Sequence, residues 1–214
     1  MNRRLLLLLA IPLVVAVAVA LGTLAGRDRA APPAPSGPVR GAPDTVVVPA
    51  ESSVHASTLA QLVGASDRVV IGRVLGTGRG RLMAGSSGGG IVTRLVRLQV
   101  EEVLAGGETG EELIVEEPGW LTDGTPVSVN GIPGSEVGDL GIWFLVRSTD
   151  PEAPYFAVIN DQGRYLVDPH DETRFRDVPV ADPLIDELER QDPIILRHQV
   201  QEAAGVFRPS RGDR

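Results

Sequence analysis

The stretch Val92-Thr93-Arg94-Leu95-Val96-Arg97-Leu98-Gln99-Val100 decides the class of fold. In an extended chain its three valines and Leu98 share one face, and the other face is mostly polar. Such alternation is typical of a strand with one buried side, so we expect a long half-buried strand over 92–103. Arg94 interrupts the apolar face near the start of this strand.

Shorter apolar segments on both sides predict further strands. The segment Ile142–Val146 is apolar on both faces, which indicates a strand at the centre of the core. The composition of Asn160–Gly163 is that of a tight turn, so the segments 155–159 and 164–167 are predicted to form a hairpin. Residues 76–90 are rich in glycine and are expected to be a loop. The remaining expected strands are 68–75, 113–116 (ended by Pro118-Gly119) and 127–129.

Three segments have helical features. Apolar residues at helical spacing predict an amphipathic helix within His55–Ala65. Two Asp-Pro pairs each place a capping residue before a proline, and predict helices over 183–191 and 193–204, with Gly205 as the stop. Six or seven strands with one helix before them and two after them indicate a mainly β fold, a small barrel or sandwich.

The first residues indicate where the chain works. A basic head precedes an almost unbroken apolar run from Leu5 to Ala25, a pattern that sends a chain into or across a membrane. The run is long enough to span, but Ala16-Val17-Ala18 also offers small residues at cleavage spacing. Residues 1–29 are therefore a signal peptide or a membrane anchor. The rest is expected to be extracytoplasmic, either secreted or held by a single span.

Composition divides the remaining chain. A Pro-rich linker is expected over 30–52, a β-barrel domain over 53–181, terminal helices over 182–205 and a flexible tail over 206–214. The chain has no cysteine, so no disulfide can support the exported domain and packing must stabilise it.

The charge of the chain limits its partners. The formal net charge is −8, and removal of residues 1–29, with four arginines and one aspartate, leaves about −11. Nucleic acid and anionic lipid surfaces need clustered positive charge, so we expect the exported part of the chain to bind neither. The one expected contact with a membrane is the insertion of residues 5–25, if they are not cleaved off.

Three stretches resemble bacterial exported domains with an OB-like, netrin/TIMP-like barrel. The first is Ala65–Val74, at the end of a helix; the second is Val100–Gly106, a strand that closes on Leu-x-Gly; the third is Val137–Leu145 with the downstream Gln162-Gly163-Arg164-Tyr165. The resemblance implies an OB-like barrel, which would often bind on one face. TIMP-type inhibitors act through an N-terminal cysteine, which this chain lacks, so their activity is not implied.

Catalytic and metal patterns are weak. Ser87 lies in a G-x-S-x-G match, but the match sits in a Gly/Ser run and precedes a strand rather than a helix. Asp168 and His170, with two further acids, could supply metal ligands, although a solvated acidic turn explains them more simply. We therefore expect no cofactor, no metal and no enzymatic activity.

A binding role is left as the leading hypothesis. Trp143 is expected in the core, whereas Trp120 follows Pro118-Gly119 in an expected loop, where a large aromatic residue often anchors a partner. Leu121 beside it and Asp139 are the other candidate contacts.

The predicted function is a non-enzymatic binding module at the cell envelope, whose loops over 76–90 and 117–135 contact an envelope protein or surface component. Two alternatives stay open. One is an exported hydrolase that uses Ser87 or a metal at Asp168 and His170. The other is a structural subunit with an exposed apolar stripe on its C-terminal helices, formed by Leu184, Ile185, Leu188, Leu196 and Val200.

Overall fold

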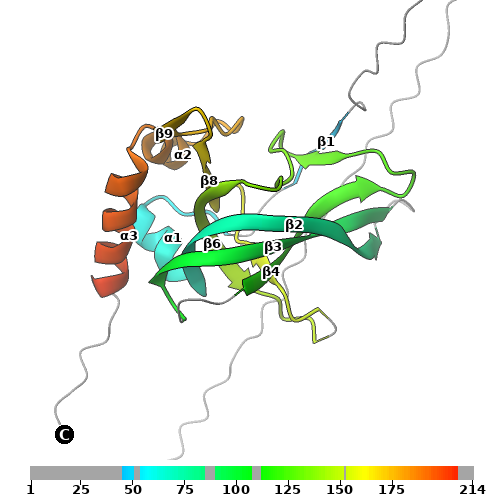
Figure 1. Cartoon of the computed structure of the whole chain (residues 1–214), viewed down its shortest axis with the longest axis horizontal. Coiled ribbons are helices and arrows are strands. Elements are labelled where there is room, and N and C mark those ends of the chain that lie inside the picture. Colours follow the sequence, from blue (N-terminus) through cyan, green and yellow to red (C-terminus); the bar gives the residue numbers. More distant parts are fainter. Residues whose placement is uncertain (1–44, 51–53, 85–89, 108–111, 152, 207–214) are drawn as a thin grey trace, which may run out of the picture.

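The computed structural model describes residues 45–50, 54–84, 90–107, 112–151 and 153–206 (Figure 1). These residues form a mainly β structure with three helices, which confirms the predicted mainly β class. The expected leader, and the expected tail apart from Val206, lie outside them, and no helix among them is long and apolar enough to cross a membrane. The strands are β1 (Val46–Val48), β2 (Arg68–Ala84), β3 (Gly90–Ala105), β4 (Glu112–Leu121), β5 (Val127–Val129), β6 (Leu140–Arg147), β7 (Phe156–Val158), β8 (Arg164–Asp168) and β9 (Asp171–Phe175). The helices are α1 (Leu59–Ala65), α2 (Pro183–Glu189) and α3 (Pro193–Val206).

Seven strands form one sheet in the order β2-β3-β4-β7-β6-β8-β9, and β2 also pairs with β6. The double pairing of β2 bends the sheet back on itself. β4 and β7 are parallel and meet only at Val115 and Phe156, which leaves the sheet short of a regular closed barrel. β1 and β5 form a separate parallel pair.

β6 separates two cores. Trp143 and Leu145 point into the sheet core, while Ile142 and Phe144 point into the helix-side core, so the strand is buried on both faces as predicted. The sheet core consists of Val70, Val74, Val96, Leu98, Val100, Leu113, Val115, Trp143, Leu145, Phe156 and Leu166.

The three helices gather on one side of the sheet (Figure 1). Thr58 caps α1, and Asp182 caps α2 by accepting from the Leu184 and Ile185 N–H groups, as the Asp-Pro pattern predicts. The apolar stripe on α2 and α3 is buried, and four of its five residues join the helix-side core. The hypothesis of an exposed stripe is therefore wrong, because these residues complete the protein's own core.

The glycine-rich segment predicted as a loop is largely strand. β2 continues to Ala84 and pairs with β3 up to Gly90, so only 85–89 lie between them, outside the described residues. Register shifts after Val74 and Arg79 mark bulges, where glycines are well tolerated. At Gly80 an added Cβ would lie 2.2 Å from Thr93 Oγ1, so its lack of a side chain serves close packing.

β4 also extends past its predicted end. Pro118 and Gly119 do not stop it, because a register shift at Val92/Thr93 takes up the extra residue as a bulge. A Cβ on Gly119 would lie 2.8 Å from the Val92 carbonyl oxygen, so only glycine fits there. Trp120 consequently lies in a strand and not in a loop.

The predicted hairpin of β7 and β8 is wrong in its pairing. The turn exists, with the Gly163 N–H donating to the Asn160 carbonyl over 3.0 Å. However, both strands pair with β6, which lies between them. Turn composition therefore predicted the reversal of the chain but not the neighbour of each strand.

One strand and two helix ends also differ from the predictions. β1 lies within the expected linker, where Val48 packs in a small cluster with Ile91 and Val127. α1 begins only at Leu59, and α3 continues through Gly205.

The burial of the terminal helices predicts the effects of two neighbouring substitutions on α3. Leu196 is 0% exposed and Ile195 is 53% exposed. We expect Leu196→Ala to lower the free energy of unfolding by about 2–5 kcal/mol. Ile195→Ala should change it by less than about 0.5 kcal/mol. Urea denaturation measures both, and equal effects would contradict the packing of α3.

Candidate binding surface

The face of β3 that is buried in the sheet core becomes a charged surface near the N-terminal end of the strand. Residues that pair across neighbouring strands point to the same side of a sheet. On this side of the sheet, the β3 residues that precede Val96 form two rows with their partners on β2 and β4. The first row is Arg79, Arg94 and Glu117, and the second is Leu82, Val92 and Trp120. We call the four residues Arg79, Leu82, Arg94 and Trp120 the Trp120 surface.

Glu117 is the buried centre of this region. Its side chain is 8% exposed and accepts hydrogen bonds from the Ser135 N–H over 2.7 Å and the Ser135 hydroxyl over 2.9 Å. Arg164 donates to it over 3.1 Å and is buried to the same degree. Arg94 Nε lies 3.7 Å from Glu117, and Arg94 Nη1 donates to the Ser135 carbonyl oxygen over 2.6 Å. One carboxylate therefore serves two nearly buried arginines.

Trp120 is half-buried beside two guanidinium groups. Arg94 Cζ lies 4.7 Å from the centre of its ring, and Arg79 Cζ lies 5.4 Å from it. Such cation–π contacts are favourable and hold the arginine side chains in place. Arg79 is exposed and makes no ion pair with a carboxylate in the part of the chain that the structure describes.

The charges of this region do not balance. Arg79, Arg94 and Arg164 face one acidic partner among the described residues, Glu117. A charge removed from water is costly unless it is paired, and Arg94 and Arg164, both nearly buried, share the single negative charge of Glu117. Arg79 adds a further positive charge at the exposed edge of this group. The arrangement can attract an anionic group to the exposed side of Trp120.

The other two predicted contacts have internal roles. Leu121 is half-buried against the cluster of Val48, Ile91 and Val127. Asp139 is 5% exposed, and both of its carboxylate oxygens are engaged, by Arg176 over 2.8 Å and by the Glu136 N–H over 2.8 Å. The structure brings neither of them to the exposed side of Trp120. Trp143 is fully buried as predicted.

Sequence reasoning missed the arginines around Trp120. Arg94 carried a signal, because it interrupts an apolar face, and Glu117 continues the alternation of Leu113 and Val115 in the same way. Arg79 gave no signal, because it lies in the glycine-rich segment that was predicted to be a loop.

The hydrolase residues do not form a described site. Ser87 lies outside the described residues. Asp168 ends β8 and His170 lies in the turn to β9, where Asp168 Oδ1 accepts from the His170 N–H over 2.8 Å. Across the described ranges, no three His, Asp or Glu side chains converge in a way that could hold a metal ion.

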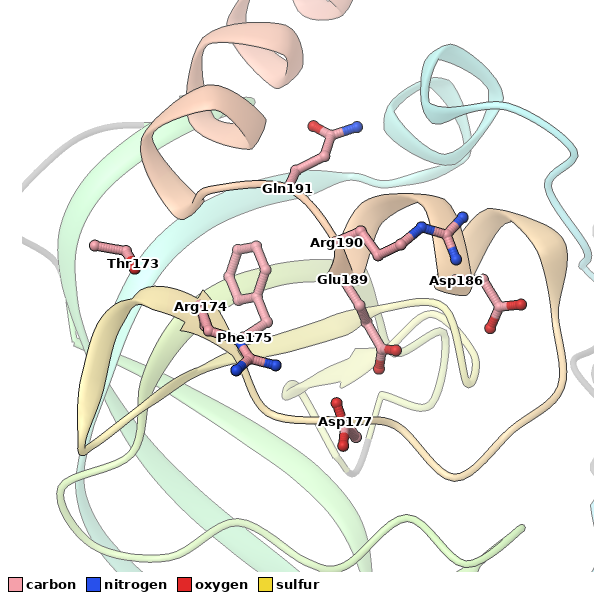
Figure 2. Close-up of a pocket in the computed structure, with 8 residues that line it drawn as sticks. All are labelled: Thr173, Arg174, Phe175, Asp177, Asp186, Glu189, Arg190 and Gln191. Atoms are coloured by element: carbon pink, nitrogen blue, oxygen red, sulfur yellow. The ribbon is translucent and has the colours of Figure 1, made fainter.

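A polar pocket lies between β9 and α2 (Figure 2). Glu189 accepts a hydrogen bond from the Val178 N–H at its edge. Partial burial raises the pKa of the Glu189 carboxyl, and repulsion from Asp177 and Asp186 adds to this rise. The pocket mixes acids and bases without a common focus, and we assign it no ligand. Its lining residues are Thr173, Arg174, Phe175, Asp177, Asp186, Glu189, Arg190 and Gln191.

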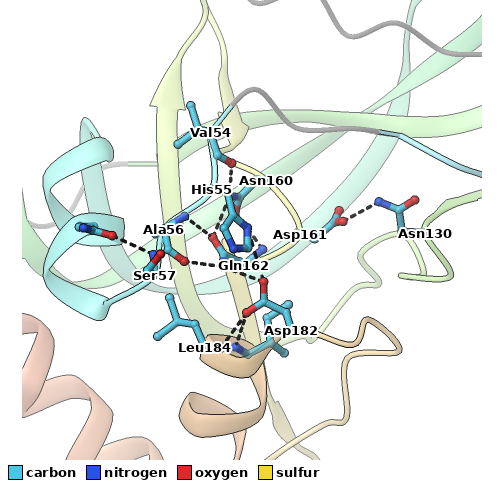
Figure 3. Close-up of polar contacts among 12 residues, drawn as sticks. Val54, His55, Ala56, Ser57, Asn130, Asn160, Asp161, Gln162, Asp182 and Leu184 are labelled. Carbon is cyan, nitrogen blue, oxygen red and sulfur yellow. Dashed lines mark hydrogen bonds and ion pairs between the residues drawn. The ribbon is translucent and has the colours of Figure 1, made fainter.

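The Gln162 side chain ties distant segments together (Figure 3). It is buried, accepts from the Ala56 N–H over 2.9 Å, and donates to the Ala56 carbonyl over 2.8 Å and to Asp182 over 3.0 Å. These bonds join the segment before α1 to the cap of α2. Gln162 therefore has a structural role.

Comparisons with known proteins do not assign this chain to a family. A scan of the chain against protein-family models found no match, and a search of curated proteins found none. The candidate site therefore depends on the geometry of this chain.

The shared use of Glu117 predicts a large effect on stability. Glu117→Gln leaves Arg94 and Arg164 without their carboxylate, and should lower the free energy of unfolding by about 3–5 kcal/mol. As a control, Glu101→Gln breaks the exposed pair with Arg73 and should leave the urea midpoint nearly unchanged. A Glu117→Gln protein as stable as the wild type would show that the arginines do not need this charge.

The raised pKa of Glu189 predicts a dependence of stability on pH. As pH rises above the ordinary value of 4.5, the unfolded carboxyl loses its proton before the folded one, so the wild type loses stability. Glu189→Gln removes this loss, and its stability relative to the wild type should increase from about pH 4 to about pH 7. Urea denaturation of the wild type and of Glu189→Gln at several pH values over this range measures the trend. A constant difference for Glu189→Gln would contradict the shift.

Proposed function

We propose that this chain is a non-enzymatic binding module that works outside the cytoplasm at the cell envelope. The Trp120 surface is where it contacts an envelope protein or surface component. The observation that carries the proposal is the excess of arginine around a half-buried tryptophan in an otherwise acidic chain. Tryptophan and arginine are the residues most enriched at the centres of protein interfaces.

The proposed architecture is an OB-like barrel. The order of pairing supports it, since β2-β3-β4-β7-β6 leads back to β2, with β4 and β7 parallel. An OB-like barrel is a five-stranded, partly open barrel that binds on the face of its second and third strands. In this chain those strands are β3 and β4, which carry Arg94 and Trp120.

Location outside the cytoplasm is supported by the sequence alone. The basic head and apolar run of residues 1–29 direct export, and the absence of cysteine suits a domain that packs without disulfides. Whether the segment is cleaved or retained as an anchor does not alter the binding surface.

Site-specific photo-crosslinking tests the proposal. A benzophenone amino acid would replace Leu82, 60% exposed on the Trp120 surface, or Leu75, 42% exposed elsewhere on β2. In the bacterium that encodes the full chain, we expect a discrete adduct from position 82 and none from position 75. Trp120→Ala should abolish the adduct while circular dichroism shows the fold intact. No adduct from position 82, or one that persists without Trp120, would overturn the proposed site.

A further inference from the structure

We infer that the Trp120 surface binds carboxylate side chains of an acidic segment of a partner protein, and that Arg79 is the arginine that pairs with them. The inference rests on the proposed binding role and names the chemistry of the partner. Its first support is the charge excess, because two of the three arginines share one carboxylate group and Arg79 pairs with none among the described residues.

Arg94 is fixed in an internal position. Its guanidinium donates to the Ser135 carbonyl, and a Cβ on Gly134 would lie 2.6 Å from its Cζ. The loop over 133–135 therefore covers Arg94, and the missing side chain of Gly134 makes room for it. Arg94 supplies positive charge to the surface but little freedom to reach a ligand.

Arg79 is the arginine that can reach a ligand. It is exposed, and its contact among the described residues is with the Trp120 ring at 5.4 Å. Because the indole holds the guanidinium in place, less side-chain freedom is lost when a ligand binds. The planar fork of donors in arginine matches a carboxylate in two parallel hydrogen bonds.

The neighbouring residues favour a protein segment over other anions. Leu82 is 60% exposed in the same row as Trp120, and can contact an apolar side chain beside the carboxylate. Nucleic acid would need a longer run of positive charge than this surface offers, since Arg79 is its one exposed arginine and the net charge of the chain is −8. Arg79 and Arg94 already lie against the Trp120 ring, so a sugar or a base that stacks on it would have to compete with these cation–π contacts.

The two tryptophans make a direct test possible. With ¹⁵N-labelled tryptophan, the full chain in uncharged detergent gives two indole N–H signals. Trp120 reports on the surface. Trp143 is fully buried and donates to the Gly72 carbonyl over 3.1 Å, so it is the internal reference. The probe is the capped peptide Leu-Glu-Glu-Leu-Glu-Glu, and the same peptide with glutamine for glutamate is the neutral control.

We expect the acidic peptide to shift the Trp120 signal in a saturable way and to leave the Trp143 signal in place. The neutral peptide should give no saturable shift. Arg79→Gln should weaken binding about tenfold, the effect of losing a charge-assisted hydrogen bond. Arg73→Gln removes the same charge from an exposed site on β2 that pairs with Glu101, and should change binding little.

Other outcomes would overturn the inference. These are no Trp120 shift at millimolar acidic peptide, equal binding of the neutral peptide, or equal effects of the two arginine substitutions. A heparin fragment or a DNA oligonucleotide that binds more tightly than the peptide would also overturn it. If the peptide fails but the crosslink from position 82 persists, the proposed function stands and only the chemistry of the partner is wrong.

Discussion

The structure depends on the pairing of β2 along both of its edges near Gly72. Over Arg68–Arg73 the strand pairs with β6, and from Val69 onward it also pairs with β3. A Cβ on Gly72 would lie 2.8 Å from Leu98 Cγ, and the Gly72 carbonyl accepts the Trp143 indole N–H. The absence of a side chain at this position therefore lets β3 and β6 approach from opposite sides and close the sheet core between them.

Beyond Arg73 the second partner ends, and β2 continues with β3 alone. The face that is buried in the sheet core thus runs outward into a region that the loop over 133–135 covers in part. Charged residues can occupy a core-facing position there, because they reach both a buried carboxylate and the solvent. The Trp120 surface is the place where the core face of the sheet becomes exposed.

Patterns of apolar and capping residues correctly predicted which strand faces are buried and where the last two helices begin. The alternation over 92–103, the doubly apolar β6 and the Asp-Pro starts of the last helices were all confirmed. The errors fell where backbone pairing decides the outcome. Gly76, Gly80 and Pro118-Gly119 are typical of loops, yet ladder pairing with bulges keeps them in strands. The order of β7, β6 and β8 likewise depends on long-range pairing, which local composition does not encode.

The sequence predicted one residue of the candidate site, Trp120, but not the arginines that give the site its charge. The sequence predicts Trp120 as a contact because a loop is expected there. The structure places it in a strand, and its proposed role depends on Arg79 and Arg94 beside it. Those neighbours are 41 and 26 positions away in the sequence, and only the register of three strands brings them together. A polar residue that breaks an apolar alternation, as Arg94 and Glu117 both do, needs a partner when it is buried. Two such breaks that fall in register form an internal ion pair between Arg94 and Glu117. Arg79 lies in the same row and pairs with no carboxylate among the described residues, so it is the residue on which the proposed binding of an acidic partner depends.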